Sequence, residues 1–218
     1  MSSPRLLMLI AVLIFLATFV QFGMISIAFD KLGLSQDSAY LLLAATLIGS
    51  MINLPLFSVA AEAAAKETPQ QEIYRLFGLR RPPFRGRTVV AVNVGGALIP
   101  LAFSAYLMLH NPLVPGEVLA VVGVVAAAAY FSSSAVQGVG IAIPLLVAPL
   151  AAALAAVLFD PDDAAPLAYI GGTLGVLIGA DLLRIGEIRK LGAPVASIGG
   201  AGTFDGIFLS GLIAVLLA

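Results

Sequence analysis

Long apolar runs separated by short polar or turn-rich breaks dominate this chain. A helix needs about 20 apolar residues to cross a hydrocarbon core of about 30 Å. Runs of this kind predict seven membrane-spanning helices, at Leu6–Ala28, Ala39–Ala61, Thr88–Leu109, Glu117–Phe131, Gly138–Phe159, Pro166–Ile185 and Ile198–Ala218. The fourth run is short and the break after it is weak, so six spans are the alternative. The pattern predicts an all-α, polytopic helix bundle that forms a single transmembrane domain over residues 1–218.

The basic residues predict how this bundle is oriented. With the loop at 62–87 on the cytoplasmic side, ten of the 11 lysines and arginines fall on that side, and only Lys31 falls outside. An excess of this kind is typical of cytoplasmic loops. The sequence therefore predicts a cytoplasmic N-terminus, an external C-terminus and a basic cytoplasmic loop at 62–87. The apolar spacing in Glu72–Leu79 predicts a short helix on the inner membrane surface.

Composition supports the membrane class and narrows the chemistry. Hydrophobic residues make up 61% of the chain and charged residues 11%, with a mean hydropathy of +1.08. These values lie far from those of soluble domains. The chain has no cysteine and one histidine, so neither a thiolate site nor a histidine-built metal centre is expected. We expect no metal, no cofactor and no nucleic-acid partner, and membrane lipid as the surroundings.

Two aspartates lie inside predicted spans, and they carry the functional prediction. Asp181 stands in I-G-A-D-L-L-R, and Asp205 follows a glycine-rich stretch in S-I-G-G-A-G-T-F-D-G. An ionisable side chain at membrane depth costs about 3 kcal/mol on insertion scales, so chains that keep one there usually use it. Both residues lie near the predicted cytoplasmic ends of consecutive helices. We therefore predict that the two carboxyl groups meet.

Asparagines and glycines are predicted to surround this pair. Asn53 and Asn93 fall in the same predicted leaflet as the aspartates. Hydrogen bonding to a neighbouring helix is the alternative explanation for each asparagine. The predicted substrate-binding residues are Asn53, Asn93, Gly199, Gly200, Gly202, Thr203 and Gly206.

Two resemblances extend this interpretation. From Gly171 to the C-terminus, with G-A-D-L-L-R and L-G-A-P-V-A-S-I-G-G-A-G-T-F-D-G-I-F-L-S-G, the chain resembles an uncharacterised family of multi-pass membrane proteins of bacteria and archaea. That resemblance implies a prokaryotic cytoplasmic membrane and no particular activity. The aspartates are also distantly similar to those of presenilin-type and prepilin-peptidase-type intramembrane aspartyl proteases. In those proteases the second aspartate stands in G-x-G-D, whereas here the sequence is G-A-G-T-F-D, and the P-A-L element after it is absent.

The protease resemblance implies an intramembrane hydrolase in which Asp181 and Asp205 are catalytic and the substrate is a membrane-embedded peptide or protein. Two carboxyl groups within hydrogen-bond reach share one proton and can activate a water molecule. A small cation- or proton-coupled transporter or channel using the same carboxylates is the first alternative. A non-catalytic membrane scaffold is the second. The oligomeric state is left open.

Overall fold

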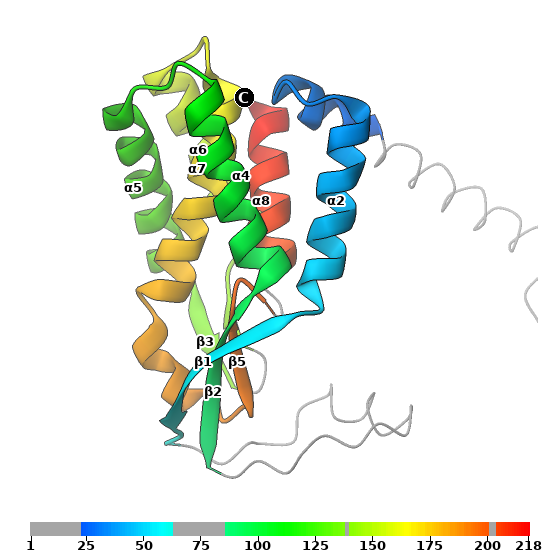
Figure 1. The fold of residues 1–218 in the computed structure, drawn as a ribbon. Coiled ribbons are helices and arrows are strands. Elements are labelled where there is room, and N and C mark those ends of the chain that lie inside the picture. Colours follow the sequence, from blue (N-terminus) through cyan, green and yellow to red (C-terminus); the bar gives the residue numbers. More distant parts are fainter. Residues whose placement is uncertain (1–22, 63–85, 138–139, 201–203) are drawn as a thin grey trace, which may run out of the picture.

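The computed structural model describes residues 23–62, 86–137, 140–200 and 204–218. Figure 1 shows a bundle of helices standing on a small sheet. The helices are α2 (Gln36–Ser50), α4 (Ile99–His110), α5 (Pro115–Ser132), α6 (Val147–Phe159), α7 (Ala164–Val176) and α8 (Phe204–Leu217), and residues 23–31 are also helical. From α2 onward, successive helices run alternately toward the sheet and away from it (Figure 1).

Three irregular helical segments adjoin α4 and α7. The π-helical turn η1 (Val94–Leu98) leads into α4, and a second π-helical turn, η2 (Leu177–Leu182), continues α7. The 3-10 helix η3 (Ile185–Lys190) follows η2 at the sheet end of the bundle.

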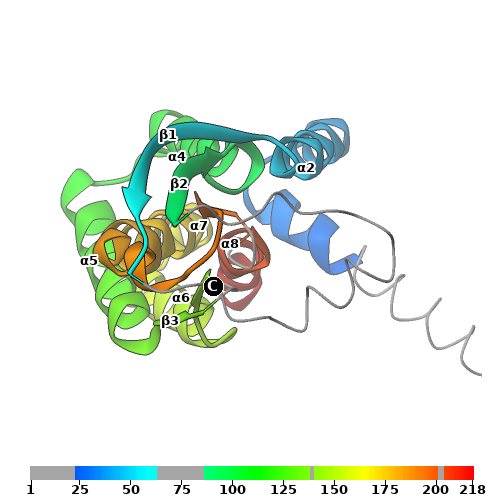
Figure 2. The same ribbon diagram turned by 90° about the horizontal axis from the view of Figure 1, so that it is seen from below.

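The sheets correct the all-α prediction. Strands β1 (Asn53–Ala60), β2 (Arg87–Asn93) and β5 (Val195–Ile198) form a three-stranded sheet in the order β1-β2-β5. Strand β1 is antiparallel to β2, with Asn53 opposite Asn93, and β5 is parallel to β2. A hairpin of β3 (Ser134–Val136) and β4 (Gly140–Ala142) is separate. Figure 2 shows β1, β2 and β5 crossing beneath the bundle.

The all-α prediction was wrong here because hydropathy does not distinguish apolar residues that favour strands from those that favour helices. The run T-V-V-A-V at Thr88–Val92 is rich in β-branched residues, which favour strands. In β1, Pro55 lacks a backbone donor and is tolerated at an edge strand. The predicted spans at Ala39–Ala61 and Thr88–Leu109 are therefore each part helix and part strand.

Two helices in the described part of the chain are long and apolar enough to cross a membrane. They are Pro115–Ser132, which contains the predicted fourth run, and Ala164–Leu182, which contains most of the sixth. The apolar helices Val94–His110 and Val147–Phe159 are shorter. Most of the first predicted span and the loop helix at Glu72–Leu79 lie outside the described residues.

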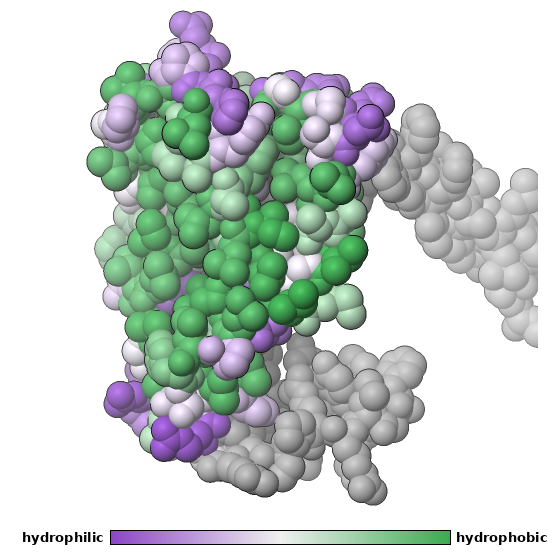
Figure 3. All heavy atoms as spheres, viewed as in Figure 1, coloured by the Kyte–Doolittle hydropathy of each residue, from purple (hydrophilic) through white to green (hydrophobic). Residues whose placement is uncertain are grey.

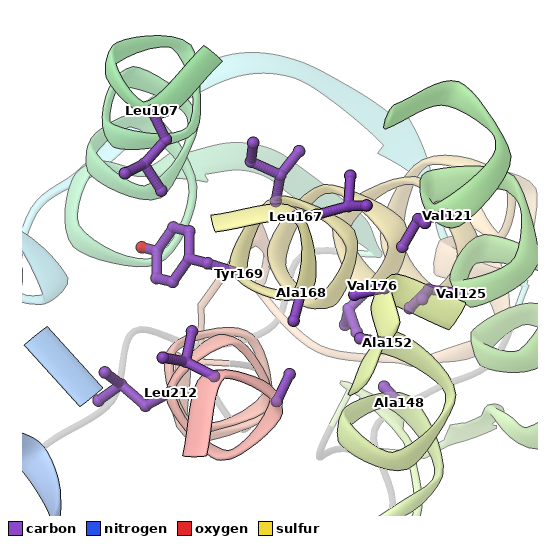
Figure 4. Packing of buried hydrophobic residues seen from close by; sticks show 14 of the residues in the cluster. Leu107, Val121, Val125, Ala148, Ala152, Leu167, Ala168, Tyr169, Val176 and Leu212 are labelled. Atoms are coloured by element: carbon purple, nitrogen blue, oxygen red, sulfur yellow. The ribbon is translucent and has the colours of Figure 1, made fainter. Parts of the chain in front are cut away.

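Helix α7 lies at the centre of the core. Its side chains pack with those of α4, α5, α6 and α8, and Leu167, Ala168 and Ile170 are fully buried (Figure 4). A Cβ added at Gly175 would lie 2.5 Å from Cβ of Val125, so only glycine allows α5 to approach this closely. Gly175 of α7 therefore serves the close packing of α7 against α5.

The sides of the bundle are strongly apolar. Large side chains point outward from several helices, including Leu41 at 73% exposure, Leu119 at 72% and Leu158 at 80%. Figure 3 shows a hydrophobic band on the visible face, with hydrophilic residues gathered at its two ends. A continuous apolar surface of this extent marks a membrane or protein interaction surface.

Candidate functional site

Asp181 lies on the second π-helical turn, where α7 reaches the sheet. A π turn widens the helix locally, and such turns occur frequently at functional sites. Asp181 is 5% exposed. The backbone N–H of Gly199 donates a hydrogen bond to its Oδ2 at 2.7 Å. The buried carboxyl group is thus held by the segment that joins β5 to α8.

Gly199 lies beside Asp181 at a point where its backbone is in direct contact with the backbone of Gly96. Its φ is +72°, in the left-handed region that favours glycine. A Cβ added at Gly199 would lie 2.6 Å from the carbonyl carbon of Gly96, and one added at Gly96 would overlap the carbonyl oxygen of Gly199. The start of the η1–α4 helix and the end of β5 are therefore in direct backbone contact beside Asp181.

A polar network lies on the other side of this glycine contact. The Nδ2 group of Asn93 donates to the carbonyl oxygen of Ser50 at 2.7 Å and to Oδ1 of Asn53 at 3.1 Å. Asn93 Oδ1 accepts a hydrogen bond from the N–H of Gly96 at 2.7 Å. Ser197 Oγ donates to Asn53 Oδ1. The network joins the end of α2, the two facing ends of β1 and β2, the first turn of η1, and β5.

A small cleft opens beside Asp181. Its volume is about 40 Å³, and its wall includes Asp181, Ser197 and Gly200 together with Gly140 and Ile141 of β4. A water molecule needs about 10–15 Å³ of such volume, so the cleft has room for a few waters. Asp181 thus borders a recess at the sheet end of the bundle whose wall is mostly apolar and also includes the Ser197 side chain.

The structure brings five of the predicted site residues to this region. They are Asp181, Asn53, Asn93, Gly199 and Gly200. Gly202 and Thr203 lie outside the described residues. Asp205 and Gly206 belong to the first turn of α8, where the structure describes the backbone and not these side chains. Contact between the two aspartate carboxyls stays a prediction.

Sequence reasoning missed two residues of this region, Ser197 and Gly96. Ser197 stands directly before the glycine-rich stretch, and Gly96 stands three residues after Asn93, where an N-terminal helical turn can donate to a capping side chain. The signal for Gly96 was therefore present, as an Asn followed by a Gly-Gly pair. Nothing in the sequence indicates that Ser197 bonds to Asn53, because 144 positions separate them.

The described residues contain no group of three or more His, Cys, Asp or Glu side chains that could hold a metal ion. Their chemistry is that of one buried carboxyl group, backbone N–H groups, amides and a hydroxyl. An arrangement of this kind can orient a carboxyl group toward a bound water molecule.

Comparison with known proteins gives a family and no activity. No curated protein and no solved structure shows significant similarity to the chain. One family model, described as a protein of unknown function (DUF1614), matches residues 47–217 and so includes the network, the cleft and both aspartates. The chain therefore belongs to the DUF1614 family of proteins of unknown function.

Proposed function

We propose that this chain is an integral membrane protein that hydrolyses peptide bonds within or near the membrane, with Asp181 and Asp205 as its catalytic residues. The observation that carries the proposal is the buried carboxyl group of Asp181, which accepts the Gly199 N–H on the approach to the helix that carries Asp205. Buried ionisable groups in such segments are functional by default.

The apolar sides of the bundle support the membrane part of the proposal. Leu119 and Leu158, on α5 and α6, are among many large apolar side chains that water would otherwise contact. In the described part of the chain, basic residues gather at the sheet end, at Arg87, Arg184, Arg189 and Lys190, and Lys31 is at the other. This distribution favours a cytoplasmic sheet end, so the Asp181 cleft would open toward the cytoplasm. The prokaryotic cytoplasmic membrane and the seven spans belong to the same proposal.

The position of Asp205 supports the pairing of the two aspartates. Asp205 is the second residue of α8, six residues beyond the Gly199 that contacts Asp181. Because Asp205 is only six positions beyond Gly199, the chain keeps Asp205 within a short distance of Asp181. This distance is compatible with contact between the two carboxyl groups.

In the proposed reaction the two carboxyl groups share one proton. The carboxylate takes a proton from a water molecule while the water oxygen bonds to the carbonyl carbon of the peptide, and the carboxylic acid gives its proton to the carbonyl oxygen. The C–N bond then breaks as the carboxyl group that was protonated by the water gives this proton to the leaving nitrogen. The other carboxylate takes a proton from a hydroxyl of the tetrahedral intermediate, which becomes the product acid. One water is consumed, an acid and an amine are formed, and the pair again holds one proton.

The substrate would be an extended peptide segment. Within the described residues β5 pairs only with β2, and its residues Val195 to Ile198 line the cleft beside Asp181. A strand with one unpaired edge can receive an extended peptide through main-chain hydrogen bonds. A cleft of about 40 Å³ is too small for a peptide, so binding requires β4 and β5 to separate.

The test uses purified protein in lipid nanodiscs and a membrane-embedded peptide whose cleavage is followed by mass spectrometry. The variants are Asp181→Asn, Asp205→Asn and the double variant. We expect each single replacement to abolish cleavage as fully as the double one, since residues that act as a unit are strongly non-additive. Asp163→Asn, in the α6–α7 connection at the opposite end, is the matched control and should cleave normally.

Two outcomes would contradict the proposal. Full activity in either single variant excludes a paired mechanism. A parent protein that cleaves nothing but binds cations, with graded losses in the single variants, points instead to a transporter or channel site.

A further inference from the structure

Both amide protons and the amide oxygen of Asn93 are engaged in hydrogen bonds to other described residues of the protein. Its two amide protons go to Ser50 and Asn53, its oxygen accepts from Gly96, and its side chain is buried. An amide carries two donors and one acceptor atom. A buried amide that bonds three separate parts of the protein in this way is suited to hold those parts in place.

The hydrogen bonds of Asn93 connect it to Asp181 through Gly96 and Gly199. Its oxygen fixes the N–H of Gly96 at 2.7 Å. Gly96 in turn packs backbone to backbone against Gly199, with no space for even one additional carbon between them. Gly199 then donates to Asp181 Oδ2 at 2.7 Å. Three successive contacts therefore connect the Asn93 amide to the carboxyl group.

A second route reinforces the first. The Asn53 oxygen that accepts from Asn93 also accepts from Ser197, two residues before Gly199. A Cβ added at Gly200 would lie 3.2 Å from Cβ of Asn93, so the residue that follows Gly199 also lies close to Asn93. Both flanks of the Gly199 peptide are thus braced by the Asn93 network.

We propose that Asn93 is a positioning residue for Asp181, acting through Gly96 and the Gly199 peptide that binds its carboxyl group. The proposal deepens the function proposed above and rests on the role given there to Asp181. It assigns Asn93 no contact with substrate, in contrast to the expectation from sequence that Asn93 binds substrate directly.

The test observes the Asp181 carboxyl group itself, by infrared difference spectroscopy of the full chain in nanodiscs. The Asp181 band is identified as the one lost in Asp181→Asn. In Asn93→Ala we expect this band to move to higher frequency, because a C–O bond that loses a hydrogen-bond donor stiffens. Asn93→Ser keeps a side-chain oxygen that can cap the turn at Gly96, and should restore most of the original position.

Two control variants separate positioning from general loss of structure. Asn111→Ala removes an amide that donates to the carbonyl of Leu107 at 2.9 Å, at the end of the bundle away from Asp181. Gly96→Ala presses directly on Gly199, whereas Gly123→Ala places a methyl group in open space. The Asp181 band should move in Gly96→Ala and stay in place in Asn111→Ala and Gly123→Ala.

An unmoved Asp181 band in folded Asn93→Ala overturns the proposal. If Asn93→Ala does not fold, the exposed variant Asn53→Ala decides, because it removes one bond from Asn93 and one from Ser197: a small shift supports the proposal and no shift overturns it. The proposed hydrolysis is judged separately. If the Asp181 band shifts in Asn93→Ala but the parent protein cleaves no peptide, the positioning role stands and the proposed hydrolysis fails. If the parent cleaves peptide but the band does not shift, the hydrolysis stands and the positioning role fails.

Discussion

Two glycines with the same backbone conformation allow the contact beside Asp181 to be measured. Gly199 and Gly33 both have φ of +72°, but a Cβ at Gly33 meets nothing within 4 Å, whereas a Cβ at Gly199 lies 2.6 Å from the Gly96 carbonyl carbon and 2.8 Å from the Ala97 Cβ. Replacing either by alanine costs about 1–2 kcal/mol for the left-handed backbone. Only Gly199→Ala adds overpacking, which costs about 1–3 kcal/mol.

We therefore expect Gly33→Ala to lower the free energy of unfolding by about 1–2 kcal/mol and Gly199→Ala to lower it by about 2–5 kcal/mol, the sum of both costs. The measurement is reversible unfolding by a denaturing detergent, in mixed micelles, followed by circular dichroism. Peptide cleavage should fall in Gly199→Ala alone, since only that residue bonds to Asp181. Equal losses of stability at the two positions would refute the close contact between Gly96 and Gly199.

Two further predictions concern the bundle. The hydroxyls of Ser104 and Thr173 form a hydrogen bond of 3.1 Å that joins α4 to α7, and a double-mutant cycle of Ser104→Ala and Thr173→Val should give a coupling energy of about 0.6 kcal/mol; Thr173→Val alone should cost more, because it also removes the bond of 2.8 Å to the Tyr169 carbonyl. A topology reporter fused after Ala218 should behave as external and one inserted near Thr68 as cytoplasmic, and a cytoplasmic Ala218 would favour six spans or an inverted chain.

The helices of the outer part of the bundle could be predicted from sequence because hydropathy alone determines them. The run at Pro115–Ser132 has no feature that competes with a helix, and its limits agree with the predicted Glu117–Phe131 within two residues. The strands could not be predicted in this way. An apolar run is equally compatible with a buried strand or helix, and β2 is a short apolar run whose partner, β5, lies over 100 positions later.

The site was predictable as a set of polar residues and not as a geometry. Asn53 and Asn93 were expected at similar depth, and the structure joins them at 3.1 Å. They meet as opposite residues of an antiparallel strand pair rather than as side chains of two packed helices. The glycine contact between residues 96 and 199 depends on the approach of two distant backbones, which leaves no trace in composition or spacing.

The strands and irregular turns that hydropathy did not predict lie close to the candidate site, and both facts have the same physical explanation. A continuous helix satisfies all of its internal backbone groups, so it offers no N–H to a neighbouring carboxyl group and no free edge to a peptide. Where a helix is interrupted, its backbone groups become available to such partners, provided that protein or water surrounds them. Here Asn53, Gly96 and Gly199, which stand at such irregular positions, are joined by hydrogen bonds and a backbone contact that lead to Asp181. Local conflict between sequence pattern and structure is expected at functional sites, so these interruptions support the site that we propose around Asp181.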